Sequence, residues 1–598
     1  MMRLFRITGV LLILLAGGAF WAQQRGLFEE AFYERSPFEA IRWTEMPEGI
    51  EVQVDDTWYA LTTIEGRTTD HLIATSKRWY GERWQKRIDE DLPQVLLRMG
   101  WWPSDTVDLT LRHLESGEAV MMDDVAMTAE NRVRIRAGRY EQEVAQLRER
   151  MQQPMPRNAM LLTLDAFETH LDERFAYAQA NDFDYKAALN RIRTDVGEDL
   201  SGNDLGLLLQ GVMAGFIDGH AGVRGFAYAE GALPFAIDVA EGGYVAFHAD
   251  RSAFIDVTHP YVTALDEVPM DVWMEAGMPL VARGSSQYRQ YGALRMLRRF
   301  NHLRAQLNLP LADSVRVTLA NAAQTSEHTI MLPVVTQEQR AVRFPQRGSQ
   351  LFDGNIGYLR LASMNDEAVE EIETWMPQFE QTDGLIIDVR GNTGGSRAAL
   401  RALFPYVMTE TDAPYVANAA KYRLNDAFDK DHLERRYMYR ADSPAWNAAE
   451  REAIETFAQT FDPEWRPPEA QFSDWHYLVL THKTTSRSFI YTAPIVILLD
   501  EKCFSATDIF LSAFKGWRNV TLVGQPSGGG SARTQDYRLD PIPLTVRMAS
   551  MASFQRDGRF YDGHGIQPDV LLTPVPTDML ADGTDTFLDA ALMRLRAP

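Results

Sequence analysis

A serine placed between an apolar run and a helical pattern is the residue of this sequence that most suggests covalent chemistry. Residues 493–500 read APIVILLD, which is typical of a buried strand, and Ser505 follows shortly before a helical pattern begins. A helix N-terminus leaves backbone N–H groups unpaired. Such groups stabilise the oxyanion that forms when a serine hydroxyl attacks a carbonyl carbon. The alternative interpretation is that Ser505 caps its helix, with Asp508 completing a capping box.

A glycine-rich turn offers a second set of backbone donors. Residues 390–395 read RGNTGG and follow another apolar run, 384–389. The N–H groups of such a turn suit an anion or an oxyanion. The turn lacks the Lys-Ser/Thr ending of a P-loop and the spacing of a dinucleotide fingerprint. The alternative interpretation is a tight turn that needs glycine only for its geometry.

Two histidines compete for the role of general base. Acyl transfer by serine needs a group that titrates near neutral pH, and histidine is the usual one. His220 lies in DGHAGV and His564 in DGHGIQPD, and we rank His220 first. Asp562, at the start of the second segment, is a carboxylate that would orient the base and stabilise its imidazolium. For the histidines the alternative is ordinary hydrogen bonding, and for the aspartate a turn.

The elements that must position these residues follow from the hydrophobic pattern. Strand patterns at 356–361 and 384–389 alternate with a helical pattern at 367–379. This alternation indicates a mostly parallel sheet within 350–586, with its chemistry at the carboxyl ends of the strands. A charged insertion that contains several tryptophans, 409–488, interrupts the pattern.

Four segments precede this α/β region. They are a small N-terminal α/β module at 38–127, a helical linker at 128–156, a helical cap that carries His220 at 157–232, and a β-rich unit at 233–336.

Composition excludes several function classes. A chain of 598 residues with 45% hydrophobic content forms several domains. The net charge of −23 argues against nucleic acid as a partner. Cys503 is the single cysteine, which excludes an internal disulfide and a cysteine-based metal cluster. The histidines show no His-Glu-x-x-His or other paired spacing, so no metal is expected.

The first residues predict export. Arg3 and Arg6 precede an apolar run, 7–22, that is shorter than a comfortable membrane span. We interpret residues 1–25 as a signal peptide or an N-terminal membrane anchor.

Six short motifs, taken in order, resemble those of the S41 serine peptidases. That family includes the tail-specific (C-terminal processing) proteases and the tricorn core protease, and the resemblance covers roughly residues 157–586. The motifs are DGH at 218–220, IGYL at 356–359, LIIDVRGN at 385–392, LDE and SATDI within 499–509, VGQP at 523–526 and GIQPDV at 565–570.

The resemblance implies a multi-domain α/β fold. Its catalytic core would be crotonase/ClpP-like, with a helical cap and a diverged PDZ-like domain at 233–336. The N-terminal module has no counterpart in the core family pattern. The implied protein is an exported serine endopeptidase, periplasmic or anchored to the membrane. It would act on peptide or unfolded protein substrates and need neither cofactor nor metal.

The resemblance also implies a mechanism. Ser505 would be the nucleophile and His220 the general base. The oxyanion would be held by the N–H groups of Ala506 and of Gly394 or Gly395.

The sequence departs from the family pattern at two positions. In the processing-protease branch a lysine of a Gly-Lys-Gly turn is the base, but Gly530 stands there. Lys515 is predicted to lie about 15 Å along the helix from Ser505, beyond side-chain reach. In the tricorn-like branch a histidine of the cap is the base, which His220 matches. The serine that precedes this histidine in that branch is replaced by Gly219.

These departures leave alternatives open. Either Asp562 or Asp218 would have to orient His220. A catalytically weak relative that binds peptides or lipophilic ligands is the second interpretation. An acyl-CoA enzyme on the related crotonase fold is the third, and export argues against it.

Overall fold

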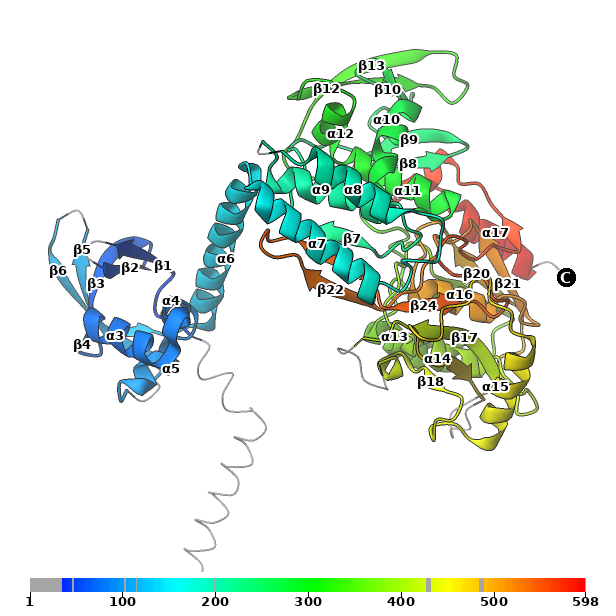
Figure 1. Ribbon diagram of the computed structural model, residues 1–598. Coiled ribbons are helices and arrows are strands. Elements are labelled where there is room, and N and C mark those ends of the chain that lie inside the picture. The colour runs from blue at the N-terminus through cyan, green and yellow to red at the C-terminus, as the bar shows by residue number, and fades with distance from the viewer. Residues whose placement is uncertain are drawn as a thin grey trace, which may run out of the picture. The chain divides into compact units, whose positions relative to one another are not determined.

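The computed structural model describes residues 35–45, 48–101, 104–114, 116–197, 199–425, 432–482 and 489–596 (Figure 1). The chain divides into two compact units, Met1–Arg150 and Met151–Pro598. The segment interpreted as a signal or anchor, 1–25, lies outside the described residues. Within the ranges given above, no helix is long and apolar enough to cross a bilayer.

The first unit is an antiparallel sheet with helices packed on it. Side chains of both layers, among them Val52, Leu72 and Leu96, form one buried core. The strand order is β1 (Ala40–Glu45), β2 (Glu48–Val54), β3 (Thr57–Ile64), β5 (Thr106–His113) and β6 (Ala119–Ala126), and β4 (Arg67–Thr68) pairs with β3. The helices are α3 (Thr69–Tyr80), α4 (Trp84–Glu90), α5 (Leu92–Arg98) and the long α6 (Ala129–Gln152).

The second unit begins with three helices, α7 (Arg157–Arg174), α8 (Tyr185–Asp195) and α9 (Gly202–Ala214). A capping box of Ser201 and Asp204 starts α9. After α9 the chain turns through residues 218–220 into β7 (Gly222–Arg224). This strand pairs with β23 (Thr545–Ala549), so the end of the helical segment is hydrogen-bonded to a strand from the C-terminal part of the chain.

Residues 233–336 form a mixed unit. Its sheet has the order β13 (Glu327–Pro333), β12 (Ser314–Ala320), β10 (Tyr261–Leu265), β9 (Gly243–Phe247) and β8 (Ala236–Ala240), with β11 (Val268–Pro269) on β10. Three helices share its core: α10 (Met270–Gly277), α11 (Ser286–Leu297) and α12 (Phe300–Gln306). The β-rich prediction was therefore incomplete. Closely spaced arginines interrupt the apolar pattern of α11 and α12, which hid the helical period.

The core sheet carries the strands that hold the candidate site. Its order is β14 (Gln350–Phe352), β15 (Ile356–Arg360), β16 (Gly384–Asp388), β20 (Ile495–Leu499), β21 (Val520–Gly524) and β25 (Val570–Leu571). All neighbours are parallel except β14 and β15. The mixed, multi-domain α/β class predicted from the sequence is confirmed.

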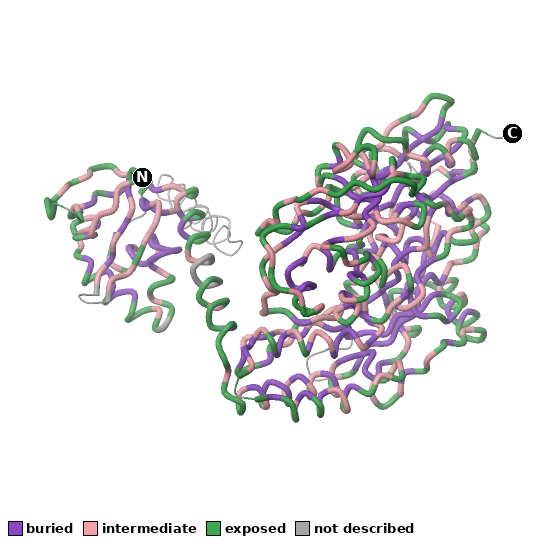
Figure 2. Tube along the Cα trace, turned by 90° about the horizontal axis from the view of Figure 1, so that it is seen from above, coloured by how far each residue is buried: buried purple, intermediate pink, exposed green. Residues whose placement is uncertain are grey.

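Helices cover both faces of this sheet, which explains its continuous apolar strands. Helices α13 (Asp366–Phe379), α14 (Ala398–Leu403) and α16 (Ala506–Phe514) pack on the face that carries Leu385 and Ile387. Helix α17 (Thr586–Arg596) packs on the opposite face, which carries Ile386. The central strands are buried along their whole length. Figure 2 shows buried residues throughout the interior of the larger unit.

The insertion 409–488 adds a second sheet to the core. Strands β17 (Tyr415–Tyr422), β18 (Tyr439–Arg440) and β19 (His476–Leu480) come from the insertion, and β17 also pairs with β24 (Met551–Phe554). Helix α15 (Ala448–Thr460) packs on this sheet, and Trp446 is buried in the same cluster. A third sheet consists of β22 (Thr534–Arg538), β23 and β7.

Candidate active site

Ser505 occupies a strained turn between β20 and α16. Its φ of 62° and ψ of −119° lie outside the regions that a non-glycine residue readily adopts. Its side chain makes no cap hydrogen bond, while the Asp508 carboxyl accepts the backbone N–H of Ser505. The helix-cap interpretation is therefore wrong for the hydroxyl, because the turn directs Oγ away from the helix end.

His220 meets that hydroxyl. Its Nε2 lies 3.0 Å from the Oγ of Ser505, which is hydrogen-bond distance. Its ring packs on Phe504, with the ring centroids 4.5 Å apart. Burial lowers the pKa of His220 to about 3, and the positive charges of Arg436 and Arg547 act in the same direction. The imidazole is therefore neutral at physiological pH and able to accept a proton.

Neither acidic candidate hydrogen-bonds to the imidazole of His220. Asp562 Oδ1 instead accepts the backbone N–H of Gly219 at 3.3 Å, and Asp218 Oδ1 accepts the backbone N–H of His220 at 2.9 Å. Among the described residues Nδ1 of His220 has no hydrogen-bond partner, and Asp218 Oδ1 lies 3.8 Å from it. The expectation that Asp562 orients the base directly was wrong. The two carboxylates hold the backbone that carries the ring.

The two carboxyl groups are buried and strongly bonded. Asp562 Oδ2 accepts the hydroxyl of Tyr177 and the N–H of Ser531, each at 3.0 Å, and Asp218 Oδ2 accepts the N–H of Ala549 at 2.9 Å. Burial raises the pKa of Asp562 to about 6. Burial and the neighbouring charge of Asp562 raise the pKa of Asp218 to about 7.

Together with His220, these carboxylates place three possible metal ligands within 4.8 Å of one another. All four carboxylate oxygens already accept N–H or O–H donors, however.

The glycine-rich turn packs directly on Ser505. A Cβ added at Gly394 would stand 2.7 Å from Ser505 Cβ and 2.9 Å from the backbone nitrogen of Ala506. The N–H of Gly394 donates to the side chain of Asn392 at 2.9 Å, so it is already engaged. In the described part of the chain, the N–H groups of Ala506 and Gly395 have no acceptor. Of the two glycines considered from the sequence, Gly395 keeps a donor available.

The ring of Phe504 explains both departures from the family pattern. A Cβ added at Gly530 would lie 2.4 Å from this ring, and one added at Gly219 would lie 2.8 Å from it. Tyr288 stacks on the same ring and donates its hydroxyl to the carbonyl of Gly219 at 2.9 Å. The space that side chains at 219 and 530 would need is therefore filled by an aromatic ring that supports His220.

The remaining candidates lie elsewhere. His564 is 40% exposed and contacts Glu464 at 3.0 Å. Lys515 forms an ion pair with Asp569. Sequence reasoning missed Tyr177 and Phe504. The position of Phe504 directly before Ser505 was the one available signal, since a residue there must lie beside the nucleophile.

Comparisons with known proteins bear on the family and the fold. Residues 355–572, which include Ser505 and the glycine-rich turn but not His220, match the model of Peptidase family S41. The structure of mature CPAF is similar, with a TM-score of 0.55 and 18% identity over 73% of this chain and 98% of that chain. Mature CPAF complexed with lactacystin gives a TM-score of 0.53 and 17% identity over 73% and 99%. At these identities the structural likeness concerns the fold. By the match over 355–572, the chain carries a domain of peptidase family S41 and is a serine-type peptidase.

Proposed function

We propose that this chain is an endopeptidase that cleaves peptide bonds through an acyl-enzyme formed on Ser505. The observation that carries the proposal is the 3.0 Å contact between Ser505 Oγ and Nε2 of a buried, neutral His220. Nucleophilic catalysis by serine requires a base within hydrogen-bond reach that is unprotonated before attack.

The reaction proceeds in two halves. Nε2 of His220 takes the proton of Ser505 as Oγ bonds to the carbonyl carbon, and the resulting imidazolium then gives this proton to the leaving amine. Water, deprotonated by the same nitrogen, releases the acid product and restores the hydroxyl. The carboxyl groups of Asp218 and Asp562 act on the imidazolium only through space, since neither hydrogen-bonds to its Nδ1.

The oxyanion of each tetrahedral intermediate lies between two backbone donors. The N–H of Ala506 begins α16, and the turn that packs on Ser505 offers the N–H of Gly395. Each donor of this kind contributes about 10²–10³-fold to the rate where one has been removed.

Substrate is an extended or unfolded chain that adds to the edge of the small sheet in the PDZ-like unit. β8 is the last strand of that sheet, and among the described residues no further strand pairs with its outer edge, to which a substrate strand would add. A cavity between β8 and α11 is also lined by residues 500–502, which precede Ser505 in the chain, and Phe235, Leu294 and Arg298 lie in its lining. For substrates that end in a free carboxylate, Arg298→Ala would raise KM with little change in kcat.

We further propose that the chain works outside the cytoplasm. The support is the pair of arginines before the apolar run 7–22. Fractionation of cells that produce the full chain tests this, and recovery of the protein only with cytoplasmic markers would contradict it.

A fluorophosphonate probe tests the catalytic assignment. We expect the probe to label the folded protein and Ser505→Ala to abolish labelling. His220→Ala should remove peptide turnover while the thermal unfolding midpoint stays near that of the unchanged protein. His564→Ala is the matched control, because this exposed histidine also contacts a carboxylate but lies outside the site. Retained turnover in His220→Ala would eliminate that residue as base. Absence of labelling in a folded protein would favour a binding protein over a peptidase.

A further inference from the structure

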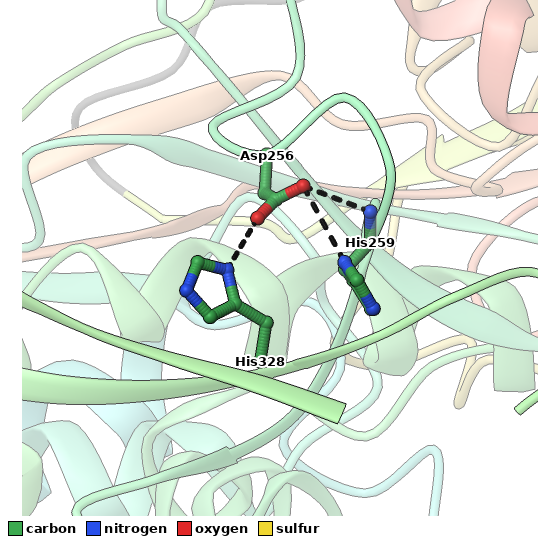
Figure 3. Close-up of side chains that lie close together, drawn as sticks. All are labelled: Asp256, His259 and His328. Atoms are coloured by element: carbon green, nitrogen blue, oxygen red, sulfur yellow. Dashed lines mark hydrogen bonds and ion pairs between the residues drawn. The ribbon is translucent and has the colours of Figure 1, made fainter. Parts of the chain in front are cut away.

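Two histidines and an aspartate meet at a second place in the molecule, within the unit formed by residues 233–336. Asp256 and His259 lie in the connection between β9 and β10, and His328 lies on β13 (Figure 3). Their possible ligand atoms are all within 4.8 Å of one another. None of the three residues belongs to the peptidase site, and no role in the proposed reaction accounts for them.

The separations suit a shared cation. Nδ1 of His328 lies 2.6 Å from Asp256 Oδ2, and Nδ1 of His259 lies 3.6 Å from Asp256 Oδ1. The two imidazole rings are 5.8 Å apart between centroids and are tilted by 56°. Ligands bound at about 2.0–2.2 Å to one zinc ion stand about 3–4 Å apart, so small side-chain rotations bring these three atoms to that spacing.

Neighbouring groups already orient two of the ligands. Nε2 of His259 lies 3.0 Å from the hydroxyl of Ser326, and Nδ1 lies 2.8 Å from the hydroxyl of Thr258, which also donates to Asp256 Oδ1. A proton on Nε2 leaves the Nδ1 lone pair for an ion, which would take the place of the Thr258 contact. Asp256 Oδ1 accepts the N–H groups of Thr258 at 2.9 Å and of His259 at 3.0 Å. Metal-binding histidines commonly donate their second ring N–H to an oxygen in this way.

Exposure leaves the cluster within reach of an ion from solvent. Asp256 and His259 are largely shielded, with side-chain exposures of 14% and 18%, whereas His328 is 52% exposed. The site thus offers one carboxylate, two imidazoles and an open side through which solvent can reach an ion.

We propose that Asp256, His259 and His328 bind a divalent transition-metal ion of the zinc class, with water completing its coordination. Imidazole nitrogens select zinc over magnesium and calcium, which prefer all-oxygen sites. The bound ion would tie the β9–β10 connection to β13. The same connection carries Arg251, whose guanidinium donates to the carbonyls of Val342 and Met579, each at 2.7 Å.

Zinc titration of the full chain tests the proposal. The protein is treated with a chelator, freed of it by gel filtration and titrated with zinc chloride by calorimetry. We expect one site that His328→Gln weakens by at least about tenfold, while magnesium chloride gives no comparable heat. His328→Gln is suitable because the side chain is half exposed and bonded to Asp256. His564→Gln is the matched control, an exposed histidine beside one carboxylate without a second histidine.

Thermal unfolding gives a second readout that separates this site from others. Zinc should also raise the thermal unfolding midpoint of the unchanged protein and of His564→Gln, but not of His328→Gln.

Equal zinc affinity in the unchanged protein, His328→Gln and His259→Gln would overturn the proposal, as would the absence of zinc binding in the unchanged protein. If His328→Gln does not fold, His259→Gln gives the same comparison. Zinc held only by the donors around His220 would leave both variants unaffected and would count against the site.

Discussion

Replacing Gly394 by alanine tests whether the glycine-rich turn is part of the catalytic centre. The backbone φ of Gly394 is +101°, so any side chain there costs about 1–3 kcal/mol of folding free energy through backbone conformation alone. The added Cβ would also stand 2.7 Å from Ser505 Cβ. Carbon atoms pack best at about 3.5–4.0 Å, so the turn and the nucleophile must separate by about 1 Å.

A displacement of this size in a catalytic centre costs about 10²-fold in rate. We therefore expect Gly394→Ala to react with a fluorophosphonate probe about 100-fold more slowly than the unchanged protein. Gly516→Ala is the matched control. Its φ is also positive, at +77°, but nothing lies within 4 Å of the added Cβ. It should lose a similar amount of stability and keep the labelling rate.

The assay is the second-order rate constant of labelling, measured on protein whose urea unfolding curve shows a folded state. Normal labelling of folded Gly394→Ala would refute the reasoning, because the turn could then move without disturbing the nucleophile. Equal slowing in both variants would refute it as well, since a general loss of stability would then account for the effect.

Three other predictions concern the groups around the site. Burial lowers the pKa of His220 to about 3. The NMR resonances of its imidazole should therefore stay those of the neutral form when the pH falls from 7.5 to about 5. Titration of these resonances near pH 6.5 would contradict this. Tyr177→Phe removes a 3.0 Å hydrogen bond to the buried carboxyl of Asp562. It should lower the free energy of urea unfolding by about 1–3 kcal/mol and slow labelling by the probe. If neither value changed, Tyr177 would not support the site through Asp562. Asp585→Ala removes one of two carboxylate partners of the buried guanidinium of Arg390, at 2.7 and 2.9 Å, while Asp388 remains bonded to it. This should cost about 1–3 kcal/mol in urea unfolding, and an unchanged midpoint would show that the pair contributes little.

The local sequence pattern was sufficient to predict features that depend on consecutive residues. The apolar runs at 384–388 and 495–499 became β16 and β20, because strands buried on both faces carry continuous apolar side chains. The position of Ser505 after such a strand and before a helix placed it at the sheet edge. The resemblance of six motifs then gave the peptidase family, which the match over 355–572 supports.

The local sequence pattern could not predict contacts between segments that lie far apart in the chain. No spacing in the sequence shows that Tyr177 reaches Asp562, or that the ring of Phe504 fills the positions opposite Gly219 and Gly530. For the same reason the sequence left open whether Asp562 or Asp218 orients His220. Its backbone, and not its ring, is hydrogen-bonded to the acidic residues.

The sequence by itself determined the class of the core and pointed to Ser505 as the candidate nucleophile, since both depend on short stretches of chain. Only the tertiary structure decided which histidine meets Ser505, what supports that histidine, and that Asp256, His259 and His328 lie together. The physical reason is that side-chain contacts a few ångströms long depend on how separate elements pack. The periodicity of one helix or strand does not show which other element packs against it.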